Sequence, residues 1–197
     1  MGRWVNVLKK KATTDVYISF MENINEKTMQ SFLSTIAQQL NKGIQNFHLL
    51  LSTSGGSVMA GIDTYYKLKA LPITLITYNT GSISSVGNLL YLAGDYRYAA
   101  PHCSFMFHGV GLSVGQNQRI EEKKLREHLA GLQRDQERLA NIVKERCSNV
   151  NVEEARNLFL EGTFKTAEEA KSMGLVHEIC NIRIPKGVSF ISLVFKG

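Results

Sequence analysis

The chain contains little cysteine, and its three cysteines form no pattern. Cys103, Cys147 and Cys180 are odd in number and widely spaced, with no Cys-x-x-Cys pair and no Cys/His ligand spacing. This argues against a disulfide framework and against a zinc site. We therefore expect a reducing compartment, no metal and no cofactor.

Long apolar runs are also absent. No segment reaches the roughly 18 apolar residues that a membrane span requires. Near the N-terminus, Lys9, Lys10 and Lys11 follow a short apolar stretch, which does not fit a secretory signal peptide. We expect a cytoplasmic protein with no membrane partner.

Proline is scarce, with three residues against sixteen glycines in 197 positions. The composition, 44% hydrophobic and 20% charged, is ordinary for a globular protein, and no repeat or linker is visible. We expect residues 1–197 to form a single domain with an N-terminal segment at 1–14. The C-terminal tail, 181–197, is rich in β-formers and is expected to add a strand or an intersubunit arm.

A net charge of +6 is compatible with nucleic-acid binding, but the distribution of the charges argues against it. Residues 118–147 carry eight basic and six acidic residues, interleaved as on a solvated helix face. Apart from this stretch, the only local basic run is residues 9–11. We therefore expect no nucleic-acid partner.

Short apolar runs alternate with segments of helical spacing along residues 16–107. From Met29 to Leu40, apolar residues recur at steps of three and four, as on an amphipathic helix. The predicted strands are Val16–Phe20, Phe47–Leu51, Ile73–Tyr78 and Ser104–Phe107, and the predicted helices are 25–40, 57–71 and 86–93. This alternation predicts an α/β fold whose catalytic groups gather at the carboxyl ends of the strands.

A much longer helix is predicted at 116–147. Its apolar residues, from Leu125 to Val143, recur at steps of three, four or seven and form one stripe. The stripe is too long for a small core, so we expect part of the helix to project and to pack against another subunit. The alternative is packing along its own domain.

Two small-residue turns and one histidine carry the candidate chemistry. Gly55-Gly56 follows a strand and allows backbone amides to approach a developing oxyanion. Ser85 lies at a strand-to-helix junction between Gly81 and Gly87, where it could also serve only as a helix cap. His108 ends a strand and precedes a glycine-rich loop, which suits a general base, although an isolated histidine is more often a core residue.

These segments together resemble the Clp protease proteolytic subunit (ClpP) from about Asp15 to Ile179. The matching motifs are Ser-Gly-Gly-Ser-Val at 54–58, Gly-x-x-x-Ser-x-Gly at 81–87, Phe-Met-Phe-His at 105–108, and the Phe-Lys-Thr-Ala segment through Gly-Leu-Val at 164–176. The resemblance implies a ClpP/crotonase-type α/β fold of repeated β-β-α units, in which 116–147 is a projecting handle helix. It also implies a homo-oligomeric ring.

The resemblance further implies a serine endopeptidase that hydrolyses unfolded polypeptides through an acyl-enzyme. Ser85 would attack the peptide carbonyl, and His108 would carry the proton. The amides of Gly56 and Val86 would hold the oxyanion. An extended peptide would pair with the backbone of residues on either side, namely Ser57, Val58, Gly111 and Leu112.

The third member of the triad is where the chain departs from the family. Counted back from Phe164 without a gap, the family's aspartate position holds Gly162. The neighbouring Glu161 could orient His108 instead, with Glu168 or Glu169 as more distant acids. A backbone carbonyl or a water could also take this role, at a cost in activity, because the third group fixes the tautomer of the imidazole.

Two further departures concern partners. Gly109-Val110 replaces the family's Gln-Pro after the histidine, which predicts a differently shaped substrate loop. Only 14 residues precede Asp15, fewer than the family's axial loop and first helix. This argues against docking to an ATP-driven AAA+ unfoldase.

Three alternatives to an active Ser–His peptidase stay open. A ClpP-like subunit with weak or no activity, serving a structural role in an oligomer, would explain Gly162. A crotonase-type protein would bind acyl-CoA with the same paired amides, but nothing in the sequence resembles an adenine or pantetheine pocket. A Ser–Lys dyad would use Lys123 or Lys124 in place of His108.

Overall fold

The fold is described from a computed structural model, which covers residues 14–112, 115 and 119–195. Its first half is a regular alternation of strand and helix, and its second half is mostly helical. The strands are β1 (Asp15–Phe20), β2 (Asn46–Thr53), β3 (Thr74–Ser84), β4 (Tyr96–Ala99), β5 (Ser104–Met106), β6 (Phe164–Thr166), β7 (Glu178–Ile179) and β8 (Ser189–Ser192). The helices are α1 (Glu26–Leu40), α2 (Val58–Ala70), α3 (Gly87–Leu92), α4 (Glu122–Arg146), α5 (Val152–Glu161) and α6 (Ala167–Ser172).

The strands form one eight-stranded sheet in the order β6-β5-β3-β2-β1-β8, and β4 pairs with β3 and with β7. All pairings are parallel except that of β5 with β6. In β2 every second side chain, from Phe47 to Thr53, is buried. This period of two places one face of the strand in the core.

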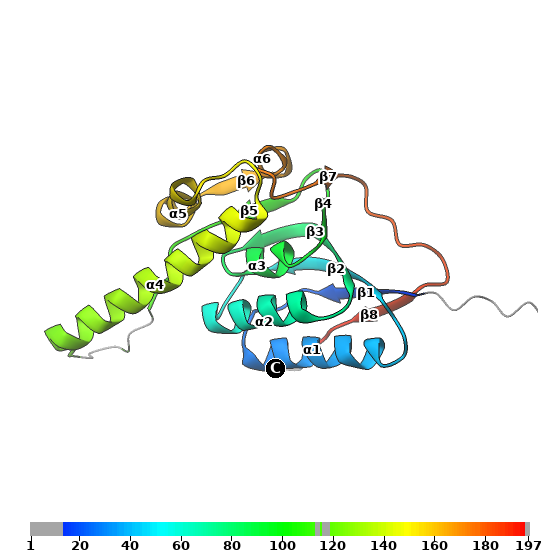
Figure 1. Ribbon diagram of the computed structural model, residues 1–197, viewed down its shortest axis with the longest axis horizontal. Coiled ribbons are helices and arrows are strands. Elements are labelled where there is room, and N and C mark those ends of the chain that lie inside the picture. Colours follow the sequence, from blue (N-terminus) through cyan, green and yellow to red (C-terminus); the bar gives the residue numbers. More distant parts are fainter. Residues whose placement is uncertain (1–13, 113–114, 116–118, 196–197) are drawn as a thin grey trace, which may run out of the picture.

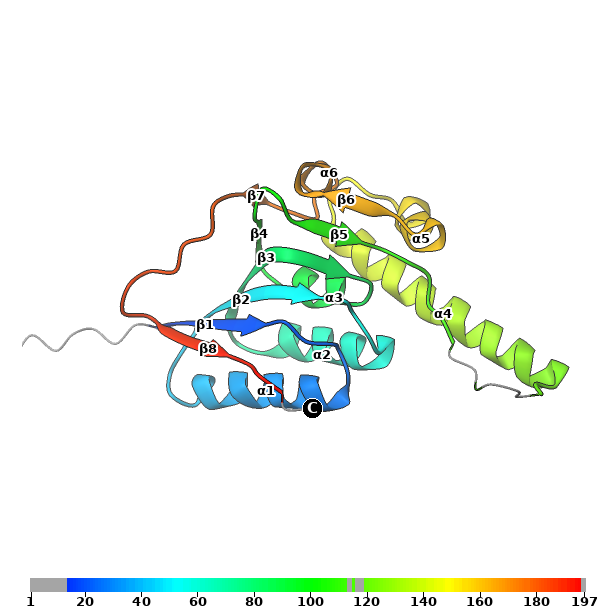
Figure 2. The ribbon, with the colours of Figure 1, turned by 180° about the vertical axis from the view of Figure 1, so that it is seen from behind.

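Helices α1, α2 and α3 lie side by side along one face of the sheet (Figures 1 and 2). Phe32 and Ile36 of α1 are fully buried and belong to the same core as Phe47 and Leu49 of β2. Helix α1 is fixed at its start by a capping box, in which Asn25 accepts a hydrogen bond from the Thr28 amide. The predicted α/β class is confirmed by this arrangement.

Helix α4 projects away from the sheet, as both views show (Figures 1 and 2). Only its C-terminal part is buried, at Leu139, Ala140, Ile142 and Val143. Leu125 and Leu129 are 57% and 54% exposed. The helix begins at Glu122, whereas the sequence predicted a start at 116; residues 119–121 are not helical, and 116–118 lie outside the described residues.

Strand β3 runs six residues beyond the predicted end at Tyr78, which corrects the turn expected at Gly81 and Ser82. Ser82, Ile83 and Ser84 pair with β5, and Ile83 is fully buried. The small polar residues here resemble a turn in sequence, but the neighbouring strand supplies hydrogen-bond partners. The strand therefore reaches Ser84, immediately before the candidate nucleophile.

The C-terminal tail forms a parallel strand beside β1, so the expectation of an added strand agrees with the fold. Residues Val16 to Ser19 pair with Ser189 to Ser192. Phe195 packs edge-on against Phe20, with ring centroids 6.4 Å apart. The tail thus covers the edge that β1 would otherwise expose.

A buried arginine ties the second half of the chain to the sheet. Arg97 is 3% exposed, and its guanidinium donates hydrogen bonds to the carbonyls of Leu175, Gly174 and Arg146 at 2.7 to 3.0 Å. The backbone amide of Arg97 donates to Nδ1 of His177 at 3.2 Å. These bonds hold the end of α4 and the approach to β7 against β4.

Candidate active site

The glycine pair after β2 forms a close contact with a distant segment. Ile24 donates its amide to the Gly55 carbonyl at 2.8 Å, and Ser57 donates its amide to the Ile24 carbonyl at 2.7 Å. Gly56 has φ +146°, and a Cβ there would lie 2.1 Å from the Ile24 carbonyl oxygen. Only glycine fits this approach. The Gly56 amide has no hydrogen-bond partner among the described residues, which leaves it free for a ligand oxygen.

Ser85 occupies a strained turn between β3 and α3. Its φ is +56°, and it is the one non-glycine residue with a positive φ in the described part of the chain. A left-handed conformation costs a residue with a Cβ about 1 to 2 kcal/mol. Strain of this kind is concentrated at functional sites, because the surrounding structure must hold it in place.

Ser85 does not serve as the cap of helix α3. Helix α3 takes Val86 as its N-cap and has no side-chain capping hydrogen bond. Within the described residues, the Ser85 hydroxyl makes no hydrogen bond, although the residue is only 9% exposed. Among the described residues, the hydroxyl therefore neither caps the helix nor ties down the turn.

Three neighbours hold the turn of Ser85. The Ser85 amide donates to the Met106 carbonyl at 2.7 Å. Asn88, which is fully buried, donates through Nδ2 to the carbonyls of Ser85 and Met106 at 2.9 and 3.0 Å. Gly55 packs so closely that a Cβ there would lie 2.7 Å from the Ser85 Cβ. The sequence analysis missed Asn88, since its role depends on how close β5 lies.

The second predicted oxyanion donor, the amide of Val86, also has no partner among the described residues. Val86 is fully buried, and its side chain contacts Gly61 of α2, where a Cβ would lie 2.2 Å from Val86 Cγ2. The free amides of Gly56 and Val86 thus stand on the turns that follow β2 and β3.

His108 lies two residues beyond β5, with an exposed ring. Its Nδ1 is 2.8 Å from the Gly109 carbonyl oxygen, so Nδ1 carries the proton and Nε2 is left with the lone pair. In the described part of the chain, no hydrogen bond joins the ring to Ser85. Apo sites often show such bonds as long or unformed.

One cavity of about 520 Å³ brings most of the predicted site residues together. Its lining includes Gly56, Ser57, Val58, Ser85, His108, Gly111 and Leu112. Val86 does not line it, but the Ser85 turn next to it does. Two lining residues that the sequence analysis did not select, Leu132 and Asp135, come from α4.

The predicted substrate-binding residues differ in whether their backbone N–H and C=O groups are already hydrogen-bonded. Ser57 donates its amide to Ile24, accepts from Gly61 at 3.0 Å, and caps α2 through its hydroxyl. Gly111 and Leu112 have no backbone hydrogen bonds among the described residues. Backbone groups for pairing a peptide are thus available on the loop after His108.

Glu161 is the last residue of α5 and is exposed. It does not line the cavity, and it makes no hydrogen bond or ion pair among the described residues. Gly162 caps the helix with φ +68°. Of the more distant acids, Glu169 accepts hydrogen bonds from Thr166 and so caps α6. The orienting contact on His108 in this structure is the Gly109 carbonyl.

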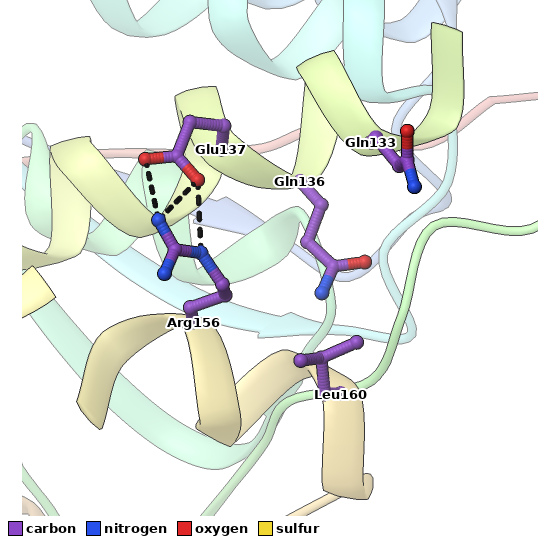
Figure 3. A pocket seen from close by; sticks show the side chains of 5 residues that line it. All are labelled: Gln133, Gln136, Glu137, Arg156 and Leu160. Atoms are coloured by element: carbon purple, nitrogen blue, oxygen red, sulfur yellow. Dashed lines mark hydrogen bonds and ion pairs between the residues drawn. The ribbon is translucent and has the colours of Figure 1, made fainter. Parts of the chain in front are cut away.

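Helix α5 is fastened to α4 beside this site. Arg156 reaches across to Glu137, with Nη2 to Oε2 at 2.7 Å, and Gln136 and Leu160 lie nearby (Figure 3). A Cβ on Gly109 would lie 3.6 Å from the Phe159 carbonyl and 3.9 Å from Gln136 Oε1. The start of the loop after His108 therefore lies against both helices.

His48, in β2, makes contacts with three side chains. Its Nδ1 is 2.9 Å from the Tyr78 hydroxyl, and its Nε2 is 3.2 Å from Asp15 Oδ1. The ring stacks on Tyr17 at 4.1 Å. No serine or cysteine is among these partners, so the contacts fasten β1, β2 and β3 together.

The described residues contain no group of three or more His, Cys, Asp or Glu that could hold a metal ion. In the same part of the chain, no helix has the length and apolar character needed to cross a membrane.

Comparison with known families agrees with this geometry. The family model described as Clp protease matches residues 2–183, which is most of the chain and includes every residue of the candidate site. The match also confirms the resemblance drawn from the glycine pair, the serine turn and the histidine. The chain belongs to the Clp protease family.

Proposed function

We propose that the chain is a serine endopeptidase that cleaves unfolded polypeptides through an acyl-enzyme on Ser85. The observation that carries the proposal concerns Ser85. Its backbone is strained, its hydroxyl does not cap a helix, and it lines the same cavity as His108. A hydroxyl that makes no hydrogen bond among the described residues is available for nucleophilic attack.

The remaining groups fit the steps of amide hydrolysis. With the Nδ1 proton held by Gly109, the His108 Nε2 lone pair takes the Ser85 proton as Oγ attacks the peptide carbonyl. The free amides of Gly56 and Val86 stabilise the oxyanion. His108 then passes the proton to the leaving amine, and water releases the acyl group by the reverse sequence.

Substrate selection rests mainly on backbone contacts. Gly111 and Leu112 offer unpaired backbone groups to an extended peptide, while Val58 adds an apolar wall. Ser57 shapes the cavity by starting α2. Backbone pairing is largely indifferent to side chains, which suits unfolded polypeptides of varied sequence.

Assembly into a homo-oligomeric ring is part of the proposal. Leu125 and Leu129 lie four residues apart on the projecting part of α4 and are more than half exposed. Burying them against a second copy of α4 would remove apolar surface from water. We expect a cytoplasmic location, no cofactor and no nucleic-acid partner.

A second candidate is a Clp-type subunit with weak or no activity that serves the ring structurally. The observation that favours it is that no carboxylate among the described residues bonds to His108. There Nδ1 contacts the Gly109 carbonyl, and Gly162 occupies the aspartate position. A carbonyl fixes the tautomer but supplies no negative charge to steady the imidazolium.

Hydrolysis of fluorescently labelled casein separates the two candidates. We expect slow cleavage by the wild-type protein and none by Ser85→Ala. Ser84→Ala is the matched control, because it removes a hydroxyl one residue away, and it should cleave like the wild type. Equal activity in Ser85→Ala and the wild type would contradict the peptidase mechanism. No cleavage by folded wild-type protein would favour the structural subunit.

A further inference from the structure

Helix α4 contributes a carboxylate to the cavity of Ser85 and His108. Asp135 and Leu132 both line this cavity and are three residues apart, so they lie on the same face of the helix. Asp135 is the one acidic residue among the described residues that line it. The apolar residues that line the same cavity include Met59, Leu112 and Leu132.

One oxygen of Asp135 is free for a ligand. Arg138 Nη1 donates to Oδ1 at 3.1 Å, and Oδ2 has no hydrogen bond among the described residues. The side chains of Asp135 and Arg138 are 31% and 49% exposed, and an ion pair this exposed is weak. A cation from a ligand could therefore share the carboxylate or displace Arg138 from it.

We propose that Asp135 is a specificity-determining residue that receives a lysine or arginine side chain of the substrate close to the scissile bond. This inference rests on the proposed peptidase function. The aliphatic stem of a long basic side chain would lie along Leu132 and Met59, and its charged end would reach Oδ2. A wall with one carboxylate among apolar groups favours this side chain over a shorter apolar one or an acidic one.

The test compares two fluorogenic peptides that differ only in lysine or leucine before the scissile bond. In the Asp135→Asn variant, which removes the charge and keeps the shape, we expect the lysine-to-leucine ratio of kcat/KM to fall about 10-fold. Asp63→Asn is the matched control: Asp63 is also ion-paired along its helix, with Lys67, but it lies on α2 outside the cavity. Its ratio should equal that of the wild type.

Binding provides a readout that does not need turnover. With the Ser85→Ala variant, fluorescence anisotropy should show tighter binding of the lysine peptide, and adding Asp135→Asn should remove that difference. An unchanged ratio together with an unchanged binding difference would overturn the inference while leaving the peptidase intact. An equal loss of both activities in Asp135→Asn would assign Asp135 to catalysis instead, which also overturns it. If no peptide is hydrolysed but the binding difference is present, the peptidase proposal fails and the basic subsite stands.

Discussion

The amide of Ser85 donates a 2.7 Å hydrogen bond to the carbonyl of Met106, which precedes His108 by two residues. This bond joins the turn that carries the candidate nucleophile to the strand that leads to the candidate base. Asn88 donates to the same carbonyl. The relative position of Ser85 and His108 is therefore fixed by backbone contacts between β3 and β5, and not by a direct bond between the two side chains.

Replacing Asn88 with alanine should weaken the site through this link. The variant loses two buried hydrogen bonds, which costs about 2 kcal/mol of unfolding free energy, and it lets the Ser85 turn relax. We expect kcat to fall about 10-fold with little change in KM. Thr64→Val is the control, since it removes a buried hydroxyl that has no partner among the described residues. A stable Asn88→Ala protein with full activity would contradict the positioning role.

Gly55→Ala should abolish activity. The new Cβ would lie 2.7 Å from both the Ser84 carbonyl and the Ser85 Cβ, so the serine turn must move. Gly43→Ala is the matched control, because Gly43 has a similar φ of +84° but open space around it. Both variants should lose about 1 kcal/mol of stability from backbone strain, and only Gly55→Ala should stop peptide cleavage. Equal activities would disagree with this prediction.

Gly162→Asp should raise activity. A Cβ at this position meets nothing within 4 Å, and Asp is among the residues that tolerate a φ of +68°. The adjacent Thr163 carbonyl accepts a hydrogen bond from the Phe107 amide at 2.8 Å, so residue 162 lies close to the chain segment that carries His108. Since removing the third triad member costs up to about 10⁴ in rate elsewhere, we expect kcat to increase at least about 10-fold. Gly162→Asn, with the same shape and no charge, should not increase it; a gain in both variants would exclude a charge effect.

The contact between Arg97 and His177 predicts a pH dependence of stability. Burial, together with Arg97 and Arg146, lowers the pKa of His177 below 6.5. The unfolded chain therefore binds the proton more readily, and this contribution to the unfolding free energy is lost as the pH falls below about 6.5. Urea titrations between pH 7.5 and 5 should show a smaller decline for His177→Asn than for the wild type. An equal decline of the unfolding free energy in the two proteins would contradict the role assigned to His177.

Sequence reasoning was most successful where local patterns decide the structure. The runs at Phe47–Leu51 and 25–40 predicted β2 and α1, and the Gly-x-x-x-Ser-x-Gly spacing led to the family. It failed where a distant neighbour decides. β3 extends to Ser84 because β5 supplies partners. The tail was expected to add a strand, but only the open edge of β1 shows where that strand, β8, pairs. Asp135 was not selected, since only the path of α4 past the loop after His108 brings it to the cavity.

Covalent labelling of Ser85 tests the central claim most directly. The folded protein is treated with a fluorophosphonate, digested with trypsin and analysed by mass spectrometry, with His108→Ala and Ser84→Ala treated in parallel. We predict modification at Ser85 in the wild type and in Ser84→Ala, and labelling at least about 100-fold slower in His108→Ala, as expected for loss of a general base. No modification of Ser85 in the folded wild-type protein, or modification that is independent of His108, would contradict the account.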